Sequence, residues 1–460
     1  MPNTRDVMGD VQTVAAIVEG TISEFTDDAV ESVVSCAFIG CSALTSIDLP
    51  VCTTVGDDAF ASCRSLASIS LPVCTTIQDY AFASCRSLTT VSLTVCVSLG
   101  EFAFYNCPSI ATINLPACTS VGGSAFRGCS ALATVSLPAC VSLGSYAFTS
   151  CSSLATISLP VCTYVGDGAF SGCRYLTTVS LPVCDSLGVY AFQDCSSLAS
   201  IDLPMCTDVG GSAFRDCSAL ATVSLPACVS LGSYAFTSCS SITSISMSVC
   251  KFLGDYAFSG CRYLATISLP VCSLVGNCAF RSCHSIASID LPACSYVGYS
   301  VFQECNGLTS VNLPACTAVG AYAFYYVRNL TTVSLPVCEG VGYSAFEGCY
   351  SLASINLPVC ERVGENTFSA CHSLATVSLP ACKTVGSYAF QFCSNLVSLY
   401  LTSVSKVPSL GYNAFTGTPI GGNSASTGYY GSVYVPASLY DAFLTASNWS
   451  SISSRIVSVA

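Results

Sequence analysis

The sequence predicts an α/β fold of one particular kind, a β-rich, right-handed solenoid with one parallel sheet and short helical or 3-10 turns on its convex side. Three observations predict it. Phenylalanine recurs every 22 residues from Phe38 to Phe390 without insertion or deletion, and a fixed period of this length is typical of stacked repeats. Each unit holds a short alternation of aliphatic and hydroxyl residues, which indicates a strand. Proline and glycine recur at constant positions and indicate turns.

Residues 1–35 form a degenerate copy of the unit. Ile22, Phe25 and Val33 fall where a preceding repeat would place its core residues. Terminal repeats of a solenoid are atypical because one face meets water in place of a neighbouring coil. We therefore expect an N-terminal capping segment over 1–35, followed by a continuous array over 36–401.

One unit illustrates the role of each position. Val135 and Leu137 alternate with hydroxyl residues, so a strand would point its aliphatic side chains inward and its hydroxyls outward. Pro138 has no N–H to donate and ends the strand. Gly144 is expected to adopt the positive φ that begins the return limb. Phe148 fills the core, where each buried ring contributes about 2–3 kcal/mol.

The 34 cysteines follow the same period. They form two rows, one three residues after the marker phenylalanines with Val327 as its one gap, and one eleven residues further on, with Cys36 and Cys278 outside both rows. Equivalent side chains on adjacent coils would run parallel about 4.8 Å apart, whereas a disulfide needs Cβ atoms about 3.8 Å apart and facing each other. We expect buried free thiols; some disulfides are the second interpretation, and a metal site the third.

The period breaks after Leu401, and 402–460 is expected to be a C-terminal cap. The elements expected there are strands over 433–435 and 456–459 and a short amphipathic helix over 438–448. Ser438 would cap the helix through its hydroxyl. Trp449 would close the open end of the core as a lid.

Composition excludes two classes of partner. The net charge is −12 and no Lys/Arg cluster could track a phosphate backbone, so we expect no nucleic acid. Hydrophobic residues make up 52% of the chain, yet Ser or Thr interrupts each apolar run before about eighteen residues, so we expect a soluble chain without a membrane span. The start, Met1 to Val7, lacks the basic and apolar regions of a secretory signal. Export by another route, prior removal of a signal and retention in a cytosol all stay open.

Residues of the array carry a family resemblance. The segment 132–140 matches the leucine-rich-repeat pattern L-x-x-L-x-L-x-x-N/C. The segment 144–160, GSYAFTSCSSLATISLP, resembles the BspA-type leucine-rich repeat with its AF-x-x-C-x-x-L-x-x-I-x-LP phrase. The segments 418–420, 433–436 and 448–450 are similar to the end cap of such proteins from gut bacteria and their phages.

The resemblance implies a fold and a role. The fold would be a leucine-rich-repeat solenoid, and the role would be that of a cell-surface or secreted adhesion protein that binds a protein or carbohydrate ligand on a cell surface. The alternative is a phage virion or tail-associated structural protein that meets a bacterial surface, made in a cytoplasm. No oligomeric state is predicted.

Catalysis is not expected. His284 and His372 each follow a row cysteine, Cys283 and Cys371, which superficially offers a Cys/His pair. Adjacent residues on a turn point apart, and the same position holds residues as different as Arg and Ser in other units. We therefore predict a non-enzymatic protein without a cofactor or a metal.

Two surfaces are candidates for binding. The outward Ser and Thr of the sheet face could bind an extended or carbohydrate-like ligand, or could serve only as a solubilising surface. The turns and the convex limb carry Tyr and Arg, the side chains that dominate interface hot spots, although some of these could simply pack over neighbouring coils. The predicted partner-binding residues are Tyr146, Tyr190, Tyr234, Tyr256, Tyr322, Tyr325, Tyr326, Arg174, Arg262 and Arg328.

Overall fold

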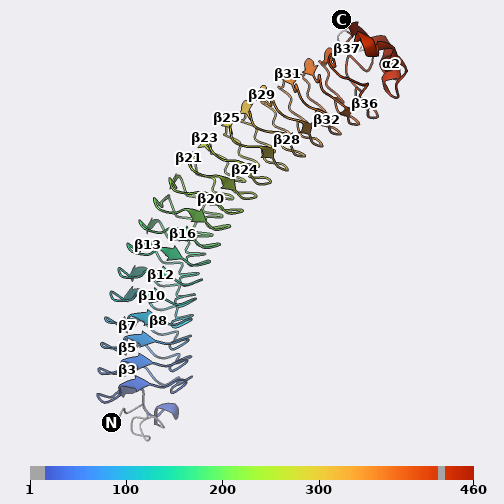
Figure 1. The fold of residues 1–460 in the computed structure, drawn as a ribbon. Coiled ribbons are helices and arrows are strands. Elements are labelled where there is room, and N and C mark those ends of the chain that lie inside the picture. The colour runs from blue at the N-terminus through green and yellow to red at the C-terminus, as the bar shows by residue number, and fades with distance from the viewer. Residues whose placement is uncertain (1–15, 423–429) are drawn as a thin grey trace. The chain divides into compact units, whose positions relative to one another are not determined.

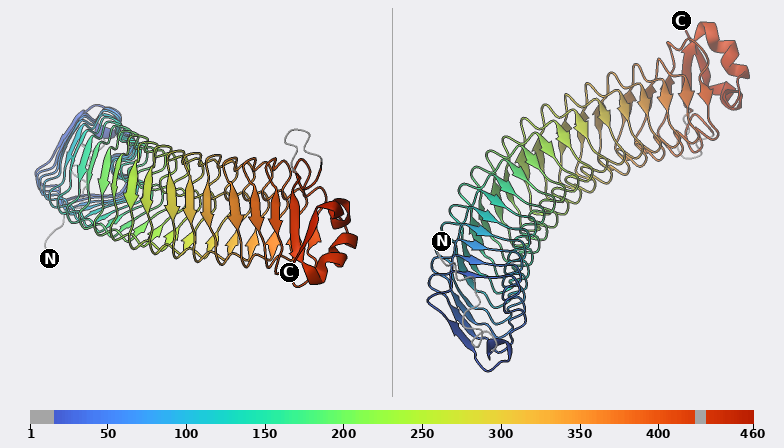
Figure 2. Two further views of the ribbon diagram at one scale, coloured as in Figure 1. Left: turned by 90° about the horizontal axis from the view of Figure 1, so that it is seen from above. Right: turned by 60° about the horizontal axis from the view of Figure 1, so that its bottom comes forward.

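The computed structural model describes residues 16–422 and 430–460. The chain divides into two compact units, Met1–Cys228 and Val229–Ala460. In both units each repeat forms one coil, and the coils follow one another in sequence order (Figures 1 and 2). The predicted solenoid with its 22-residue coil is confirmed.

Each coil carries a three-residue strand whose central side chain points inward. In the first unit these strands are β1 (Glu24–Thr26), β3 (Ser46–Asp48), β5 (Ser68–Ser70), β7 (Thr90–Ser92), β9 (Thr112–Asn114), β11 (Thr134–Ser136), β13 (Thr156–Ser158), β15 (Thr178–Ser180), β17 (Ser200–Asp202) and β19 (Thr222–Ser224). In the second unit they are β21 (Ser244–Ser246), β23 (Thr266–Ser268), β25 (Ser288–Asp290), β27 (Ser310–Asn312), β29 (Thr332–Ser334), β31 (Ser354–Asn356), β33 (Thr376–Ser378) and β35 (Ser398–Tyr400). All paired neighbours are parallel, but the pairing is interrupted, so the three-residue strands form several short sheets in place of the expected single sheet.

A second ladder of two-residue strands runs through both units and was not expected. In the first unit it consists of β2 (Ser32–Val33), β4 (Thr54–Val55), β6 (Thr76–Ile77), β8 (Ser98–Leu99), β10 (Ser120–Val121), β12 (Ser142–Leu143), β14 (Tyr164–Val165), β16 (Ser186–Leu187) and β18 (Asp208–Val209). In the second unit it consists of β20 (Ser230–Leu231), β22 (Phe252–Leu253), β24 (Leu274–Val275), β26 (Tyr296–Val297), β28 (Ala318–Val319), β30 (Gly340–Val341), β32 (Arg362–Val363), β34 (Thr384–Val385) and β36 (Ser409–Leu410). Each pairs in parallel and in register with its neighbours.

The return limb of the described coils consists of turns, so the expected helical or 3-10 turns are wrong. Alternate amides of the limb bond to the next coil: Tyr146 N donates to Asp167 O at 2.7 Å and Phe148 N to Ala169 O at 2.7 Å. Tyr146 and Ser150 both have φ of 61°. A helix needs each amide to bond within its own segment and needs negative φ, so neither condition is met.

Gly144 does not have the positive φ expected of it, because that conformation belongs to Tyr146. The glycine is required for space. A Cβ atom on Gly144 would lie 2.6 Å from the backbone N of Gly123 and 2.7 Å from the backbone C of Gly122. Adjacent coils are therefore too close at this position to leave room for a side chain.

The marker phenylalanines form a stacked spine within each unit. In the first unit the rings of Phe104 and Phe126 have centroids 5.4 Å apart and planes within 2°. In the second unit Phe236 and Phe258 repeat this arrangement at 5.4 Å and 3°. Because these rings are fully buried, they supply the bulk of the apolar contact between coils, as predicted.

Both cysteine rows hold buried free thiols, as expected, and Cys36 alone is exposed. In the first row the thiol donates to the carbonyl of a phenylalanine in the preceding coil, as Cys173 Sγ does to Phe148 O at 3.1 Å. In the second row it donates to a carbonyl two residues ahead, as Cys140 Sγ does to Ser142 O at 3.2 Å. Burial raises the pKa of Cys173 to about 12. The Phe148 carbonyl also accepts the amide of Cys151 at 3.1 Å, so the first-row thiol is a second donor to a carbonyl that is already hydrogen-bonded.

The N-terminal core residues are placed largely as expected. Phe25 and Val33 are buried, whereas Ile22 is half-buried. The ring of Phe25 tilts by 47° against Phe38, at 5.0 Å.

The C-terminal segment adds β37 (Ser432–Pro436), η1 (Ala437–Leu439), α2 (Tyr440–Thr445), η2 (Trp449–Arg455) and β38 (Ile456–Val459). Both expected strands are present, and β35, β37 and β38 are neighbours in one sheet. The helix is shorter than expected, and Ser438 does not cap it, since its N-cap residue is Leu439 and no side chain makes a capping bond there. Trp449 is buried and donates from Nε1 to Pro408 O at 2.8 Å, so the predicted lid is confirmed. No helix among the described residues is long and apolar enough to cross a membrane.

Candidate functional site

The tyrosines predicted to bind a partner occupy two kinds of surroundings. Tyr146 lies beneath a guanidinium, with Arg127 Cζ 5.8 Å from its ring centroid. Tyr234 and Tyr256 stack on each other at 4.8 Å and 5°. Tyr190 is exposed. None of these side chains belongs to a larger aromatic group among the described residues.

Arg174 and Arg262 are exposed, and each is followed by a tyrosine that the sequence reasoning missed. Tyr175 is 67% exposed and Tyr263 is 65% exposed, which makes them the most exposed tyrosines of the described chain. The repeated Arg-Tyr dipeptide was the signal that could have identified them. The two pairs lie in different units and are separate sites.

By contrast, the structure brings four predicted residues of the second unit together: Tyr322, Tyr325, Tyr326 and Arg328. They join tyrosines from neighbouring coils in one connected group. We define the tyrosine cluster as Tyr299, Tyr322, Tyr325, Tyr326, Tyr343 and Tyr350.

Edge-to-face contacts hold the cluster together. Tyr322 is its centre, with ring centroids 5.5 Å from Tyr299, 5.1 Å from Tyr343 and 5.3 Å from Tyr325. Tyr325 contacts Tyr326 at 4.5 Å and 64°. Such aromatic pairs contribute about 0.5–1.5 kcal/mol each beyond the area they bury, so the rings are positioned before any partner arrives.

The sequence reasoning missed half of this cluster. Tyr299 and Tyr343 stand one position before the tyrosine position of their coils, which holds Ser300 and Ser344 instead. Both serines are 0% exposed. A comparison of two neighbouring positions across successive coils would have found these tyrosines.

The remaining rings extend the group along the coils. Tyr350 contacts Tyr326 at 6.1 Å and stacks on His372 at 5.1 Å and 15°. Arg328 Cζ lies 5.8 Å from the ring centroids of both Tyr326 and Tyr350. A guanidinium at this distance from an aromatic face is attracted by about 0.5–2 kcal/mol.

The phenols of Tyr322, Tyr325 and Tyr326 are neutral at physiological pH. Desolvation, helped by hydrogen bonding to Tyr343, raises the pKa of Tyr322 to about 12. Desolvation also raises the pKa of Tyr325, assisted by the charge of Glu347, and that of Tyr326. Each hydroxyl can therefore both donate and accept a hydrogen bond.

A hollow of about 350 Å³ opens beside the cluster, lined by His284, Glu304, Asn306, Tyr325, Tyr326 and Arg328. The Glu304 carboxylate accepts a hydrogen bond from Ser282 Oγ at 3.0 Å. His284 Nδ1 lies 3.0 Å from the Glu304 carbonyl oxygen. Aromatic, cationic and anionic groups thus converge on one small space.

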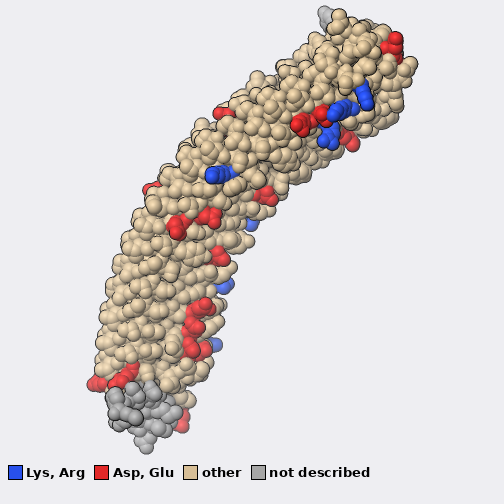
Figure 3. All heavy atoms as spheres, in the orientation of Figure 1, with Lys and Arg blue, Asp and Glu red and all other residues tan. Residues whose placement is uncertain are grey.

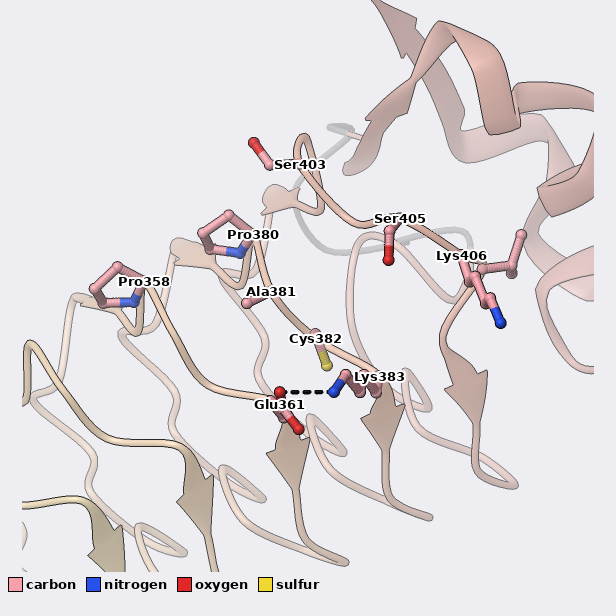
Figure 4. A pocket seen from close by; sticks show the side chains of 10 residues that line it. Pro358, Glu361, Pro380, Ala381, Cys382, Lys383, Ser403, Ser405 and Lys406 are labelled. Atoms are coloured by element: carbon pink, nitrogen blue, oxygen red, sulfur yellow. Dashed lines mark hydrogen bonds and ion pairs between the residues drawn. The ribbon is translucent and has the colours of Figure 1, made fainter.

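A second hollow of about 740 Å³ lies where the repeat period breaks, lined by Pro358, Glu361, Pro380, Ala381, Cys382, Lys383, Ser403, Ser405, Lys406 and Val407. Figure 4 shows Lys383 reaching from one coil to Glu361 on the coil before it, with Nζ 2.6 Å from Oε1. Acidic and basic side chains gather near this C-terminal end of the second unit, whereas most of the face in Figure 3 is uncharged. Both partners of the pair are exposed, so it contributes only about 0.2–1 kcal/mol.

The geometry does not form a Cys/His catalytic pair. Cys283 Sγ donates to Phe258 O at 3.1 Å inside the core, and burial raises its pKa well above the ordinary value. His284 lies at the surface. Cys371 is likewise buried, with its thiol bonded to Phe346 O at 3.1 Å. A nucleophile needs an accessible thiolate, and these thiols are neither accessible nor ionised. No three His, Cys, Asp or Glu side chains converge as a metal site within 16–422 and 430–460.

Comparison with known proteins identifies a family. The family described as "BspA type Leucine rich repeat region (6 copies)" matches residues 21–133, 119–243, 163–270, 229–337 and 317–422. No curated protein matches the chain.

Several solved structures are similar in fold. A leucine-rich repeat protein from Bacteroides ovatus is 22% identical, with 95% of this chain and 92% of that chain covered and a TM-score of 0.42. A leucine rich cell surface protein from Faecalibacterium prausnitzii is 22% identical, with 84% and 88% covered and a TM-score of 0.32. The pneumococcal vaccine antigen PcpA is 13% identical, with 95% and 87% covered and a TM-score of 0.27.

Proposed function

The chain belongs to the BspA-type leucine-rich-repeat family, and from that premise we propose that it is a non-enzymatic binding protein that uses its tyrosine cluster to bind a protein or glycan on a cell surface. The observation that carries the proposal is the connected group of six tyrosines around the exposed Arg328. Tyr and Arg are the residue types that dominate binding hot spots. Their contacts with one another fix the rings in place, so less side-chain entropy is lost on binding.

The scaffold supports this role. The aliphatic, phenylalanine and row-cysteine side chains of each coil are buried in the core, and the row thiols are hydrogen-bonded and protonated. The thiols of the two rows therefore offer no accessible nucleophile, whereas the exposed side chains of the coils offer a rigid surface for recognition. Repeat proteins commonly bind through such surfaces, because a fixed core can carry different exposed residues in each coil.

The test is a binding assay on intact cells with fluorescently labelled protein. Tyr325→Ala/Tyr326→Ala removes two central rings of the cluster, and Tyr175→Ala/Tyr263→Ala removes two exposed rings outside it. We expect the first variant to weaken binding at least about tenfold, since truncating a hot spot costs about 2 kcal/mol or more. We expect the second to bind like the wild type.

Two outcomes would count against the proposal. In the first, the cluster variant binds as tightly as the wild type while retaining its circular dichroism. In the second, both variants lose affinity equally. Cells treated with protease and cells treated with periodate separate a protein partner from a glycan partner.

A further inference from the structure

Arg328 is held by aromatic rings and has no acidic partner. Its Cζ atom lies over Tyr326 and Tyr350 at 5.8 Å from each centroid. Two ion pairs occur among the residues that the structure describes, and neither involves Arg328. A guanidinium presents five N–H donors in one plane, arranged to hold a carboxylate by two parallel bonds. Arg328 therefore presents an exposed guanidinium at the edge of the hollow, and its N–H donors are free to bind a carboxylate.

The other residues of the hollow supply hydrogen-bond acceptors. The Glu304 carboxylate is oriented by Ser282 at 3.0 Å and retains further lone pairs. The His284 ring is oriented by the Glu304 carbonyl, which can only accept, so Nδ1 carries the proton. In the tautomer that carries its proton on Nδ1, Nε2 is left as an acceptor. These groups are suited to hydroxyl donors.

Two rings complete the hollow. Tyr325 and Tyr326 meet at 64° with centroids 4.5 Å apart, so they present two apolar walls in different directions. The volume of about 350 Å³ is at the lower end of the range for small-molecule sites, about 300–1,000 Å³. This space is suited to a single ring-shaped residue rather than to an extended side chain.

We propose that this hollow binds a carboxylate-bearing sugar residue of a glycan. Arg328 holds the carboxylate, Tyr325 and Tyr326 pack against the C–H faces of the sugar ring, and Glu304 and His284 accept hydrogen bonds from its hydroxyls. The ligand carboxylate lies on the Arg328 side, because the Glu304 charge repels it. This inference rests on the proposed function and names its ligand class. Uronic acids and sialic acids share the required chemistry.

An acidic peptide fits the hollow less well. An Asp or Glu side chain would give Arg328 its carboxylate, but it has no hydroxyls for Glu304 and His284. Covering these acceptors with a ligand that gives them no donor lowers affinity. A sugar acid satisfies both halves of the site with one residue.

The experiment measures binding of defined oligosaccharides to the full chain by calorimetry. The ligands are digalacturonic acid, its methyl ester, 3′-sialyllactose and lactose; the ester and lactose are the uncharged counterparts of the two acids. The variants are Arg328→Gln and, as a matched control at the same repeat position eleven coils earlier, Arg86→Gln. Circular dichroism and Trp449 emission verify that each variant is folded.

We expect the wild type to bind at least one acid and to bind its uncharged counterpart at least about tenfold more weakly, since a charge-assisted bond is lost. Arg328→Gln should weaken acid binding by a similar factor, and Arg86→Gln should leave it within about twofold. The preferred acid distinguishes a uronic from a sialic source.

The inference is overturned if neither acid binds, if the uncharged counterparts bind equally well, or if Arg328→Gln binds like the wild type. If the sugar-binding tests give these results but Tyr325→Ala/Tyr326→Ala still weakens cell binding, the proposed function stands and the ligand is of another class. If, in addition, Tyr325→Ala/Tyr326→Ala binds cells as tightly as the wild type, both the proposed function and the proposed ligand class are refuted.

Discussion

Two glycines of a single coil should respond in opposite ways to alanine. Gly340 begins β30, and a Cβ atom there would meet nothing within 4 Å. A Cβ atom on Gly342 would lie 2.8 Å from both Ala321 N and Gly320 C, which are backbone atoms of the preceding coil. Neither glycine has positive φ, so backbone conformation does not separate them. The two glycines differ in the space that is available for a Cβ atom.

The structure sets the magnitude. Ordinary contact for such a Cβ begins at 3.4 Å, so Gly342→Ala has to move two coils apart by several tenths of an ångström. The amide of Gly342, which donates to Val319 O at 2.8 Å, resists that movement. Overpacking of this kind costs about 1–3 kcal/mol. Gly340→Ala removes freedom from the unfolded chain and should stabilise the protein by about 0.4–1 kcal/mol.

Urea unfolding followed by circular dichroism compares the two variants with the wild type. A repeat array need not unfold in one step, so the midpoint is the quantity to compare. Gly342→Ala should unfold at lower urea and Gly340→Ala at equal or higher urea. The reasoning is refuted if Gly340→Ala loses as much stability as Gly342→Ala, or if Gly342→Ala keeps the wild-type midpoint.

Three further outcomes are expected. Maleimide should modify one thiol per native chain, at Cys36, and all 34 after denaturation; mass spectrometry showing several native modifications would contradict the burial of the rows. Because burial raises the pKa of Cys173 from 9.0 to about 12, the unfolded thiol ionises first, so stability is intact below about pH 9 and falls toward pH 12 by about 1.4 kcal/mol per unit for each such thiol. Ellipticity that stays native to pH 12 under reducing conditions would refute this. Phe148→Ala should cost about 3–5 kcal/mol and Phe148→Leu less, and equal urea midpoints would argue against a stacked spine.

Much of the fold could be predicted because repetition multiplies a weak local signal. A single alternation such as Val135 and Leu137 is poor evidence for a strand, but the same alternation recurs throughout the array. Phe148 and the cysteine rows were assigned to the core for the same reason. The lid formed by Trp449 followed from its place after the last coil, where an open core needs a cover.

The return limb was predicted wrongly because its decisive contacts are nonlocal. A helical turn is a local alternative for the segment around Ala147 and Phe148, and nothing in the local sequence shows that Phe148 N donates to Ala169 O in the next coil. The positive φ of Tyr146 is equally hidden, since bulky side chains seldom adopt it. Inter-coil bonding stabilises a conformation that local preference disfavours.

The candidate site could be predicted only in part. From residue type alone, Tyr322 and Tyr190 were both predicted to bind a partner. In the structure only Tyr322 belongs to the tyrosine cluster. Ring contacts arise between coils, so they depend on what the neighbouring coil carries at the adjacent position. Tyr322 has Tyr299 and Tyr343 on either side, whereas Tyr190 has no aromatic residue at either of those positions, which hold Asp167 and Gly211.

A natural duplication shows how strongly neighbours decide surface chemistry. Residues 121–153 recur as 209–241 with one difference, Gly128 against Asp216. In the first copy Arg127 lies over the ring of Tyr146. In the second copy the equivalent Arg215 pairs with Asp216 at 3.2 Å. A single exposed position thus redirects a guanidinium from an aromatic ring to a carboxylate while the core stays the same. Arg328 lies between Val327 and Asn329, so it has no acidic neighbour in the sequence with which to pair, and its donors stay available to a ligand.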